Sequence, residues 1–387
     1  MSKIFIMGAV GEMCIEATRD IVKTGDFDKF MLADKDGKKL KKLTEELDDV
    51  RIETMTLDAT DKDAVAEAIS GYNIVMDGLP FDKIEPTVRA CLQEKIPHID
   101  LISPLEVIDR YEKDFEENET LAVAGVGMTP GLTDLMARYG VERCDKVNEI
   151  YVYWAAYRPF AISPGLVMTT YWEMDPKTEE RAYYENGEFH PQPPMQKSRT
   201  VRFEPPYEDL DVYHVPHPET FTLPKNVPEV EKVETMGTWP PQVMNMLKQM
   251  LDYGFFDTDK IEYKDEEYET LDLFAHILHQ VPGGQETPLW GYALRVEVHG
   301  EKNDEKIKYI LTHSHPAMEE WGGKRTYAKN VAIPMSIGAQ MIQKGKIQAN
   351  KGYHTAFETF KPEEFFQELK KRGIRVHVEN WRHYDIS

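Results

Sequence analysis

The sequence predicts an α/β protein, with an N-terminal doubly wound parallel sheet and a second α+β domain that contains a mainly antiparallel sheet. Three observations lead to this fold class. Short apolar runs alternate with amphipathic helical stretches over residues 3–126, as in a parallel sheet with helical crossovers. The first apolar run ends in a glycine turn that opens a helix. From about Val147 the pattern changes to alternating strands and long polar connections, which favours an antiparallel layer.

The chain begins with the elements of a dinucleotide-binding unit. An apolar strand, Ile4–Met7, meets the turn Gly8–Met13, which opens an amphipathic helix over Cys14–Lys23. A second apolar strand, Phe30–Ala33, ends in Asp34. This order of elements is that of a Rossmann cofactor site. Glycine lets the backbone approach a pyrophosphate, the helix N-terminus offers free N–H groups, and the terminal carboxylate can accept both ribose hydroxyls of NAD.

Asp34 predicts a preference for NAD, because its charge disfavours the 2′-phosphate of NADP. Lys35 could pair with that phosphate, so NADP is a possible cofactor as well. Two features leave alternatives open. Val10 and Met13 occupy the second and third glycine positions of the G-x-G-x-x-G pattern. Asp34 could instead cap the following helix, although Asp36 is better placed to do so.

The remaining strands and helices of this region predict where a ligand would lie. Strands are expected over residues 51–57, 73–76, 98–101 and 121–126, and helices over residues 36–47, 63–69, 86–94 and 104–118. In such sheets the ligand lies over the carboxyl ends of the strands. Asp58, Ser103 and the turn Gly127–Gly131 follow such ends. We expect the cofactor to contact Gly8, Ala9, Val10, Gly11, Glu12, Met13, Asp34, Lys35, Asp58, Ala59, Gly78, Leu79 and Pro80.

The second half of the chain predicts a different layer. Strands are expected over residues 150–155, 289–299, 306–314 and 375–379, and helices over residues 331–344 and 362–372. The stretches 163–175 and 236–253 are helical or mixed, and residues 191–228 are expected to form long connections.

Composition limits the class of protein. The chain has 387 residues, of which 41% are hydrophobic, as expected of two folded domains. Its net charge of −22 argues against nucleic acid and against an anionic membrane as partners. No apolar run is long enough to cross a bilayer, and the first strand begins without a secretory leader. The scattered cysteines, Cys14, Cys91 and Cys144, suit reduced thiols, so we expect a cytoplasmic protein.

Short motifs spread over most of the chain carry a family resemblance. They are Gly8-Ala9-Val10-Gly11, Ala33-Asp34, Leu57-Asp58-Ala59, Gly78-Leu79-Pro80, His98-Ile99-Asp100-Leu101, the segment Gly127–Thr133, His217-Pro218-Glu219-Thr220, the segment Ile333–Met341 and Phe366–Gly373. Together and in this order they resemble the saccharopine dehydrogenase-like family, which includes saccharopine reductases, lysine 6-dehydrogenases and carboxynorspermidine dehydrogenases.

The resemblance implies an oxidoreductase that transfers a hydride between NAD(P) and the carbon of a C–N bond, through an imine. Its small-molecule substrate would be an amino acid or an opine-like conjugate. The resemblance further implies a homodimer and three regions: an NAD(P)-binding Rossmann domain over residues 1–130, a substrate and dimerisation domain over residues 131–330, and C-terminal elements over residues 331–387 that pack back on the first domain. The chemistry needs one acid/base group and a clamp for a carboxylate.

The candidate catalytic residues are His217, Glu219 and Thr129. His217 and Glu219 lie in a proline-bounded segment, where they could exchange protons or simply cap backbone groups. Thr129 stands where many family members have Asp in a G-x-D-P-G turn, so an obvious partner for a substrate ammonium group is missing. The pair His214 and His217 lacks further ligands at metal-binding spacing, and no metal site is expected.

Three residues are candidates for substrate binding. Arg158 and Arg325 could each hold a carboxylate through two parallel hydrogen bonds, or form structural ion pairs with the chain's many acids. Ser103 follows a predicted strand end, where its hydroxyl could reach the ligand.

Other enzyme classes lack their motifs in this sequence. No Tyr has a Lys four residues on, as short-chain dehydrogenases require, and no P-loop, G-x-S-x-G elbow or H-E-x-x-H helix occurs. The remaining alternative is a Rossmann protein without redox activity, which binds NAD as a structural or regulatory ligand. The residues Val10, Met13 and Thr129 motivate this alternative.

Overall fold

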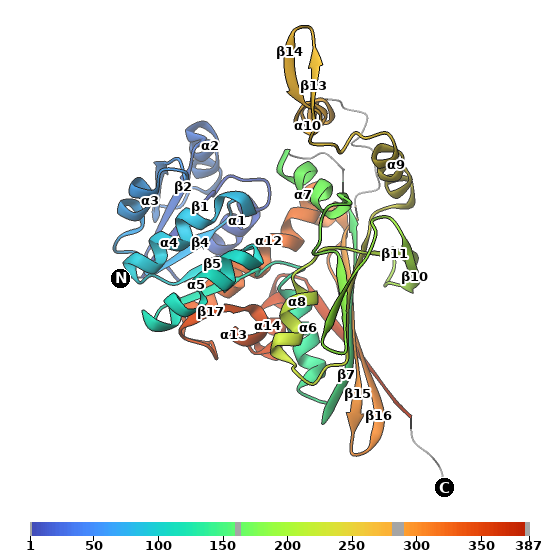
Figure 1. The fold of residues 1–387 in the computed structure, drawn as a ribbon. Coiled ribbons are helices and arrows are strands. Elements are labelled where there is room, and N and C mark those ends of the chain that lie inside the picture. Colours follow the sequence, from blue (N-terminus) through green and yellow to red (C-terminus); the bar gives the residue numbers. More distant parts are fainter. Residues whose placement is uncertain (1, 159–163, 281–289, 384–387) are drawn as a thin grey trace. The chain divides into compact units, whose positions relative to one another are not determined.

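The computed structural model describes residues 2–158, 164–280 and 290–383 (Figure 1). The chain divides into two compact units. Unit 1 consists of Met1–Tyr139 and Ala328–Arg375, and unit 2 consists of Gly140–Tyr327 and Val376–Ser387. The chain therefore leaves unit 1, builds most of unit 2, returns to unit 1 at Ala328, and passes into unit 2 again at Val376.

Unit 1 is built on a seven-stranded sheet with the strand order β17-β6-β5-β4-β1-β2-β3, in which every pairing is parallel. Six of these strands follow the order 3-2-1-4-5-6 of a doubly wound dinucleotide-binding sheet, which confirms the predicted fold class. Their bounds are β1 Lys3–Met7, β2 Lys29–Asp34, β3 Ile52–Thr56, β4 Ile74–Asp77, β5 His98–Asp100, β6 Leu121–Ala124 and β17 Gly352–Thr355.

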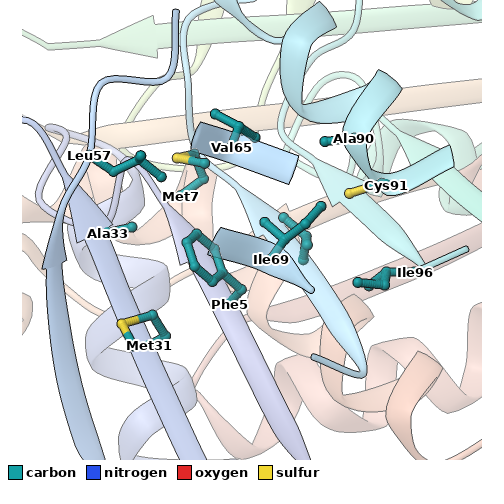
Figure 2. Packing of buried hydrophobic residues seen from close by; sticks show 11 residues of the cluster. Phe5, Met7, Met31, Ala33, Leu57, Val65, Ile69, Ala90, Cys91 and Ile96 are labelled. Carbon is teal, nitrogen blue, oxygen red and sulfur yellow. The ribbon is translucent and has the colours of Figure 1, made fainter. Parts of the chain in front are cut away.

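Apolar strands and amphipathic helices bury a common core in unit 1. Phe5 and Met7 of β1 pack with Met31 of β2 and with Val65 and Ile69, as Figure 2 shows. Strands β1, β2, β4, β5 and β6 are largely buried on both sides, which explains their nearly continuous apolar runs, whereas the edge strand β3 is partly exposed. The helices of unit 1 are α1 Cys14–Thr24, α2 Gly37–Leu47, α3 Lys62–Ile69, α4 Glu85–Glu94, α5 Leu105–Glu117, α13 Ala356–Thr359 and α14 Pro362–Lys371. Two more, α6 Leu132–Val141 and α12 Arg325–Gln343, contain the points at which the chain passes between the units.

Side chains at the helix ends fix where the helices begin. The Asp36 carboxylate accepts hydrogen bonds from the backbone N–H groups of Lys38 and Lys39 and so caps α2. The Asp61 carboxylate accepts one from Ala64 and caps α3. Asp36 is therefore the cap that the sequence suggested, and Asp34 is left for another role.

The returning C-terminal segment is tied to unit 1 by strand pairing and by an ion pair. Strand β17 pairs in parallel with β6 and extends the sheet at that edge. Arg372, which follows α14, lies 2.9 Å from Asp20 of α1, and the hydroxyl of Ser336 of α12 donates to the same carboxylate over 2.6 Å. Residues from the two ends of the sequence thus lie side by side.

Unit 2 is built on a nine-stranded sheet that is mainly antiparallel. Its main path is β10-β11-β12-β7-β15-β16-β18, and β8 joins β9 to β12. Strands β7 and β12 are parallel, whereas β15 pairs antiparallel with both β7 and β16 (Figure 1). The bounds are β7 Lys146–Tyr157, β8 Ala182–Glu185, β9 Glu188–Pro191, β10 Lys197–Arg202, β11 Asp209–His214, β12 Lys232–Thr238, β15 Gly291–Lys302, β16 Glu305–Ser314 and β18 Arg375–His383.

The remaining elements of unit 2 are its helices and a small two-stranded sheet. They are α7 Pro164–Met174, α8 Glu219–Asn226, α9 Pro241–Asp252, α10 Thr270–Gln280, α11 Met318–Trp321, β13 Lys260–Tyr263 and β14 Glu266–Glu269. None of the helices in the described ranges is long and apolar enough to cross a membrane.

One expectation for unit 2 was wrong. Residues 191–228, expected to be connections, contain β10, β11 and α8. Strand β10, with the sequence KSRTVR, is mostly polar and only Val201 in it is buried, so it lacks the alternating apolar pattern that identifies a half-buried strand. Residues 236–253, expected to be helical or mixed, are mixed: they contain the end of β12 and the helix α9, and Pro240 and Pro241 lie where the strand ends and the helix starts. Ser163 and Leu289, the first residues of two predicted elements, lie outside the described residues.

Candidate functional site

The glycine turn after β1 packs against the turn after β4. Gly8 has a φ of +67°, and a Cβ added there would lie 3.2 Å from the carbonyl carbon of Gly78. A Cβ at Gly78 would lie 2.2 Å from the Cβ of Cys14. Both positions therefore require glycine, one for its conformation and both for close packing. The two turns, predicted separately as cofactor contacts, lie against one another.

The start of α1 offers backbone donors next to this turn. The N–H of Gly11 donates to Gly8, and the N–H of Ile15 donates to Gly11. In the described part of the chain, no acceptor is found for the backbone N–H groups of Glu12, Met13 and Cys14. Free N–H groups at a helix N-terminus are the usual ligands of a pyrophosphate. This donor set, with the space that glycine leaves, fits a dinucleotide.

The substituted glycine positions do not both face the surface. Val10 is only 4% exposed, so its side chain packs in the interior of unit 1, whereas Met13 is half-buried. Thr18 supports the turn from inside, because its hydroxyl donates to the carbonyl of Ala9 over 3.1 Å. The core of unit 1 therefore accommodates the side chain of Val10, which is larger than the glycine of the motif.

Asp34 lies at the carboxyl end of β2, beside the glycine turn. One carboxylate oxygen accepts from the backbone N–H of Val10 over 3.3 Å, and the other accepts from Asp36 over 3.0 Å. These contacts fix the carboxylate, and each oxygen retains a lone pair for a further donor. Its neighbour Lys35 is exposed.

The other predicted cofactor residues lie at the ends of β3 and β4. Asp58 is exposed and accepts from the backbone N–H and the hydroxyl of Thr60, and these hydrogen bonds lower the pKa of Asp58. Asp58 is thus a turn residue, and its contact with the cofactor stays a prediction, as does that of Ala59. Leu79 and Pro80 complete the turn after β4.

A buried polar network, which the sequence analysis missed, lies at the ends of β4 and β5. The side chains of Asp77, His98 and Asp100 are completely buried. Nε2 of His98 lies 3.4 Å from Asp77, and Nδ1 lies 3.6 Å from Asp100. Polar residues at the ends of two neighbouring strands were a signal available in the sequence, because such ends line the ligand side of the sheet.

Ser103 belongs to this network. Its hydroxyl lies 2.5 Å from the Asp100 carboxylate and 2.6 Å from the hydroxyl of Tyr353, a residue of β17. Burial raises the pKa of Asp100 to about 6, although His98, the backbone N–H of Gly125 and Ser103 act in the opposite direction. Direct binding of substrate by Ser103 stays a prediction.

Unit 2 contains a second buried charged cluster, which brings three of the predicted site residues together. Arg158 follows β7, His217 precedes α8, and Glu219 is the first residue of that helix; all three are buried. Nδ1 of His217 lies 3.3 Å from Glu219, and Nε2 lies 3.9 Å from Glu173 of α7.

Helix α7 contributes Thr170 and Glu173 to this cluster, and neither was anticipated. The guanidinium of Arg158 donates over 3.2 Å to Thr170, which precedes Glu173 on α7. Glu173 is 5% exposed, and its Oε2 has no hydrogen-bond partner among the described residues. A buried carboxylate oxygen without a donor is costly, which makes it a candidate for contact with a ligand.

The two glutamates set the charge of His217. Burial by itself would lower the pKa of this imidazole, but Glu173 and Glu219 outweigh it and raise the pKa to about 9. The ring is therefore protonated at neutral pH and can act as an acid. Strongly shifted groups with specific charged partners are typical of functional sites.

Aromatic side chains complete the cluster. The guanidinium of Arg158 lies 5.4 Å from the ring centre of Tyr327, which stacks on Tyr292 at 5.4 Å. The ring of Trp154 lies 5.6 Å from that of His217 and packs flat over Gly237, where a Cβ would lie 2.2 Å from the indole. Nothing in the sequence indicated Tyr292 or Tyr327, because residues so distant in sequence meet only through the sheet.

Two predicted site residues lie outside this cluster. Thr129 is half-buried in unit 1, in a tight turn whose Gly131 has a φ of +118°. Arg325, at the start of α12, is exposed. Their roles stay predictions that rest on the sequence. His214 lies 3.8 Å from Glu234 of β12, and so contacts a different carboxylate from its neighbour His217.

Comparisons with known proteins agree with this architecture. The family model of the saccharopine dehydrogenase NADP binding domain matches residues 4–125, and that of the saccharopine dehydrogenase C-terminal domain matches residues 127–374. Among characterised proteins, carboxyaminopropylagmatine dehydrogenase from Synechocystis sp. is 20% identical over 395 residues, which cover 97% of each chain.

Two solved structures share the fold over nearly the whole chain. Saccharopine dehydrogenase (L-Glu forming) from Saccharomyces cerevisiae superposes with a TM-score of 0.72 at 14% identity, over 98% of this chain and 100% of that one. Homospermidine synthase from Legionella pneumophila, determined with NAD, gives a TM-score of 0.64 at 12% identity, over 98% of this chain and 92% of that one.

Proposed function

Because the chain belongs to the saccharopine dehydrogenase family, we propose that unit 1 binds the nicotinamide dinucleotide and that the buried cluster of unit 2 binds and protonates the substrate. Family membership confirms the expectation of an NAD(P)-dependent oxidoreductase that acts at a C–N bond, rather than the alternative of a Rossmann protein without redox activity. The residues that carry out each step, the preferred cofactor and the substrate are the proposal.

The cofactor role rests on the two glycine turns and the start of α1. The backbone N–H groups of Glu12, Met13 and Cys14 would hold the pyrophosphate, and Gly8 and Gly78 would leave room for it. Asp34 would accept the ribose hydroxyls, which favours NAD over NADP. When bound, the nicotinamide accepts or supplies the hydride of the reaction.

The substrate role rests on one observation: His217 lies between two buried carboxylates in a cluster that also contains Arg158. Arg158 would hold a substrate carboxylate through two hydrogen bonds. The unpaired oxygen of Glu173 would accept a hydrogen bond from the substrate nitrogen. The substrate would therefore carry a carboxylate and an amine, as an amino acid or an opine-like conjugate does.

His217 would exchange the proton that the C–N chemistry requires. As an imidazolium it can donate a proton to the substrate nitrogen during reduction, and as a neutral imidazole it can accept one during oxidation. Glu219 and Glu173 orient the ring and stabilise its charged form. Reduction should then weaken as the pH rises through about 9, whereas oxidation should strengthen over the same range.

We also propose that the protein is a cytoplasmic homodimer. The family resemblance supports the dimer. The scattered thiols support the compartment. Cys14 and Cys91 are free thiols buried in unit 1, where they are not accessible for a disulfide with another molecule, and burial raises the pKa of the Cys14 thiol to about 12. Sedimentation of the purified protein tests the dimer.

A titration of NADH and NADPH, read by nicotinamide fluorescence, tests the cofactor proposal. We expect NADH to bind more tightly, and Asp34→Ala to change the ratio of the two dissociation constants by about tenfold toward NADPH. The matched control is Asp36→Ala, which removes the cap of α2 and should lower the melting temperature but leave this ratio unchanged. An unchanged ratio in Asp34→Ala would contradict the role of Asp34.

A separate screen of carboxylated amines, with the cofactor that binds more tightly, identifies the substrate.

A further inference from the structure

The network of Asp77, His98 and Asp100 is the most deeply buried group of ionisable residues in unit 1 that the proposed chemistry does not use. All three side chains are completely buried. Charged groups are costly to bury unless they are well paired, so a cluster of this kind needs a physical reason. Its contacts with the backbone provide that reason.

Asp77 holds the turn that follows β4. One oxygen of its carboxylate accepts from the backbone N–H of Leu79 over 2.9 Å, and the other lies 3.4 Å from Nε2 of His98. Gly78, between them, lies against Gly8, where a Cβ would be 3.2 Å from its carbonyl carbon. Any shift of the turn Gly78–Pro80 is therefore passed directly to the glycine turn after β1.

Asp100 holds the segment that follows β6. Its carboxylate accepts from the backbone N–H of Gly125 over 2.9 Å and from the hydroxyl of Ser103 over 2.5 Å. Its backbone carbonyl accepts from Val126 over 2.8 Å. All four carboxylate oxygens of the network are thus engaged, and those of Asp100 fix the entry into the turn Gly127–Gly131.

We propose that His98 is a positioning residue for the cofactor: by joining Asp77 to Asp100 it holds the turn Gly78–Pro80 and the segment around Gly125 in one fixed arrangement. Its Nε2 shares a hydrogen bond with Asp77, and its Nδ1 lies 3.6 Å from Asp100 without a hydrogen bond of its own among the described residues. Since His98 is fully buried behind these turns, it acts on the bound dinucleotide through the backbone and does not touch it. The inference rests on the proposed cofactor site.

The test compares NADH binding by three variants of the full-length protein with that of the wild type. His98→Leu removes the hydrogen bond to Asp77 and the 3.6 Å contact with Asp100, and we expect it to raise the dissociation constant of NADH about tenfold. Asp77→Asn can still accept from Leu79 and can donate to a neutral ring, so it should keep binding within about threefold of the wild type. His354→Gln is the control, because His354 of β17 is also paired with a carboxylate, that of Glu358 at 2.9 Å, but does not join the network.

The outcomes separate this inference from the proposed function. If the wild type binds neither NADH nor NADPH, the proposed function fails. If the wild type binds NADH and folded His98→Leu binds it equally well, only the role of His98 is overturned. A purely structural role would lower the melting temperature of His98→Leu and of His354→Gln alike, with no change in the dissociation constant. Should His98→Leu not fold, His98→Met, which likewise lacks a hydrogen-bond donor, takes its place, with the same expected weakening and the same contradicting result.

Discussion

The two units each bury a histidine between two carboxylates, and the hydrogen bonds around those carboxylates differ. In unit 1, the ring nitrogens of His98 lie 3.4 Å and 3.6 Å from Asp77 and Asp100. In unit 2, those of His217 lie 3.3 Å and 3.9 Å from Glu219 and Glu173. Because the residue types and distances are so similar, a histidine between two carboxylates does not by itself indicate a role.

The capacity left for further hydrogen bonds distinguishes the two clusters. In unit 1 each carboxylate oxygen of Asp77 and Asp100 has a hydrogen-bond partner, in part the backbone N–H groups of Leu79 and Gly125, and the atom without one among the described residues is Nδ1 of His98. In unit 2 it is a carboxylate oxygen, Oε2 of Glu173, that has no partner within the described ranges, and Arg158 adds a cation. Carboxylates bonded to the backbone can hold it in place, whereas an unpaired carboxylate oxygen beside a cation can still receive a ligand.

The largest expected effect separates His217 from its sequence neighbour His214. Replacing His217 with Asn should lower kcat by about two to four orders of magnitude, because the acid that serves the substrate nitrogen is lost. His214→Asn removes a histidine that contacts Glu234 instead, and should leave kcat within about threefold. Steady-state turnover of the identified substrate measures both. Wild-type turnover in His217→Asn would mean that the unit 2 cluster is not catalytic.

The two clusters should change the free energy of unfolding over different pH ranges. The pKa of His217 is raised from 6.5 to about 9, so its stabilising effect is complete below pH 6.5 and is lost as the pH rises through 9. The pKa of Asp100 is raised from 3.8 to about 6, so folding favours its protonated form, and that contribution is lost as the pH rises from 3.8 through 6. Each contribution is on the order of 3 kcal/mol.

Urea denaturation across the pH range measures this difference. The unfolding free energy of the wild type minus that of His217→Asn should fall between pH 6.5 and 9, and the difference for Asp100→Asn should fall between pH 3.8 and 6. Equal slopes for wild type and variant in either window would show that the group concerned is not coupled to folding.

A smaller effect tests the unused oxygen of Glu173. Glu173→Gln should raise the KM for substrate by about tenfold and lower the melting temperature by less than Asp77→Leu, because Oε2 has no internal partner to lose and only the charge that faces His217 is removed. Asp77→Leu is the contrasting change in unit 1, where the N–H of Leu79 would be left unpaired at a cost of about 1–3 kcal/mol in stability. A fall in melting temperature for Glu173→Gln that matches Asp77→Leu would remove the distinction between the clusters.

The sequence predicted unit 1 more completely than unit 2 for physical reasons. Apolar strands that are buried on both faces, such as Ile4–Met7, are visible in the sequence, and the acid at the end of the second strand could be named. Strand β10 could not be predicted, because its polar residues lie on a partly exposed part of the sheet. Hydrogen-bond capacity was also invisible: no pattern distinguishes the engaged carboxylate of Asp77 from the unpaired oxygen of Glu173.

The residues of the unit 2 cluster could also be predicted only in part. Arg158, His217 and Glu219 were predicted one by one from their chemistry, and the fold brings them together. Tyr292 and Tyr327 belong to elements far apart in the sequence, so only the three-dimensional arrangement reveals them as members of the cluster. His98 and Asp100 lie in a motif that was noted for its family resemblance, but their burial could not be anticipated.

The most direct test of the division between the clusters is a titration of NADH into the wild type, His98→Leu and His217→Asn under one set of conditions. The structure predicts that the dissociation constant rises about tenfold in His98→Leu and stays within about twofold in His217→Asn. Equal weakening in both variants, or weakening in His217→Asn alone, would contradict the assignment of one histidine to the cofactor and the other to the substrate.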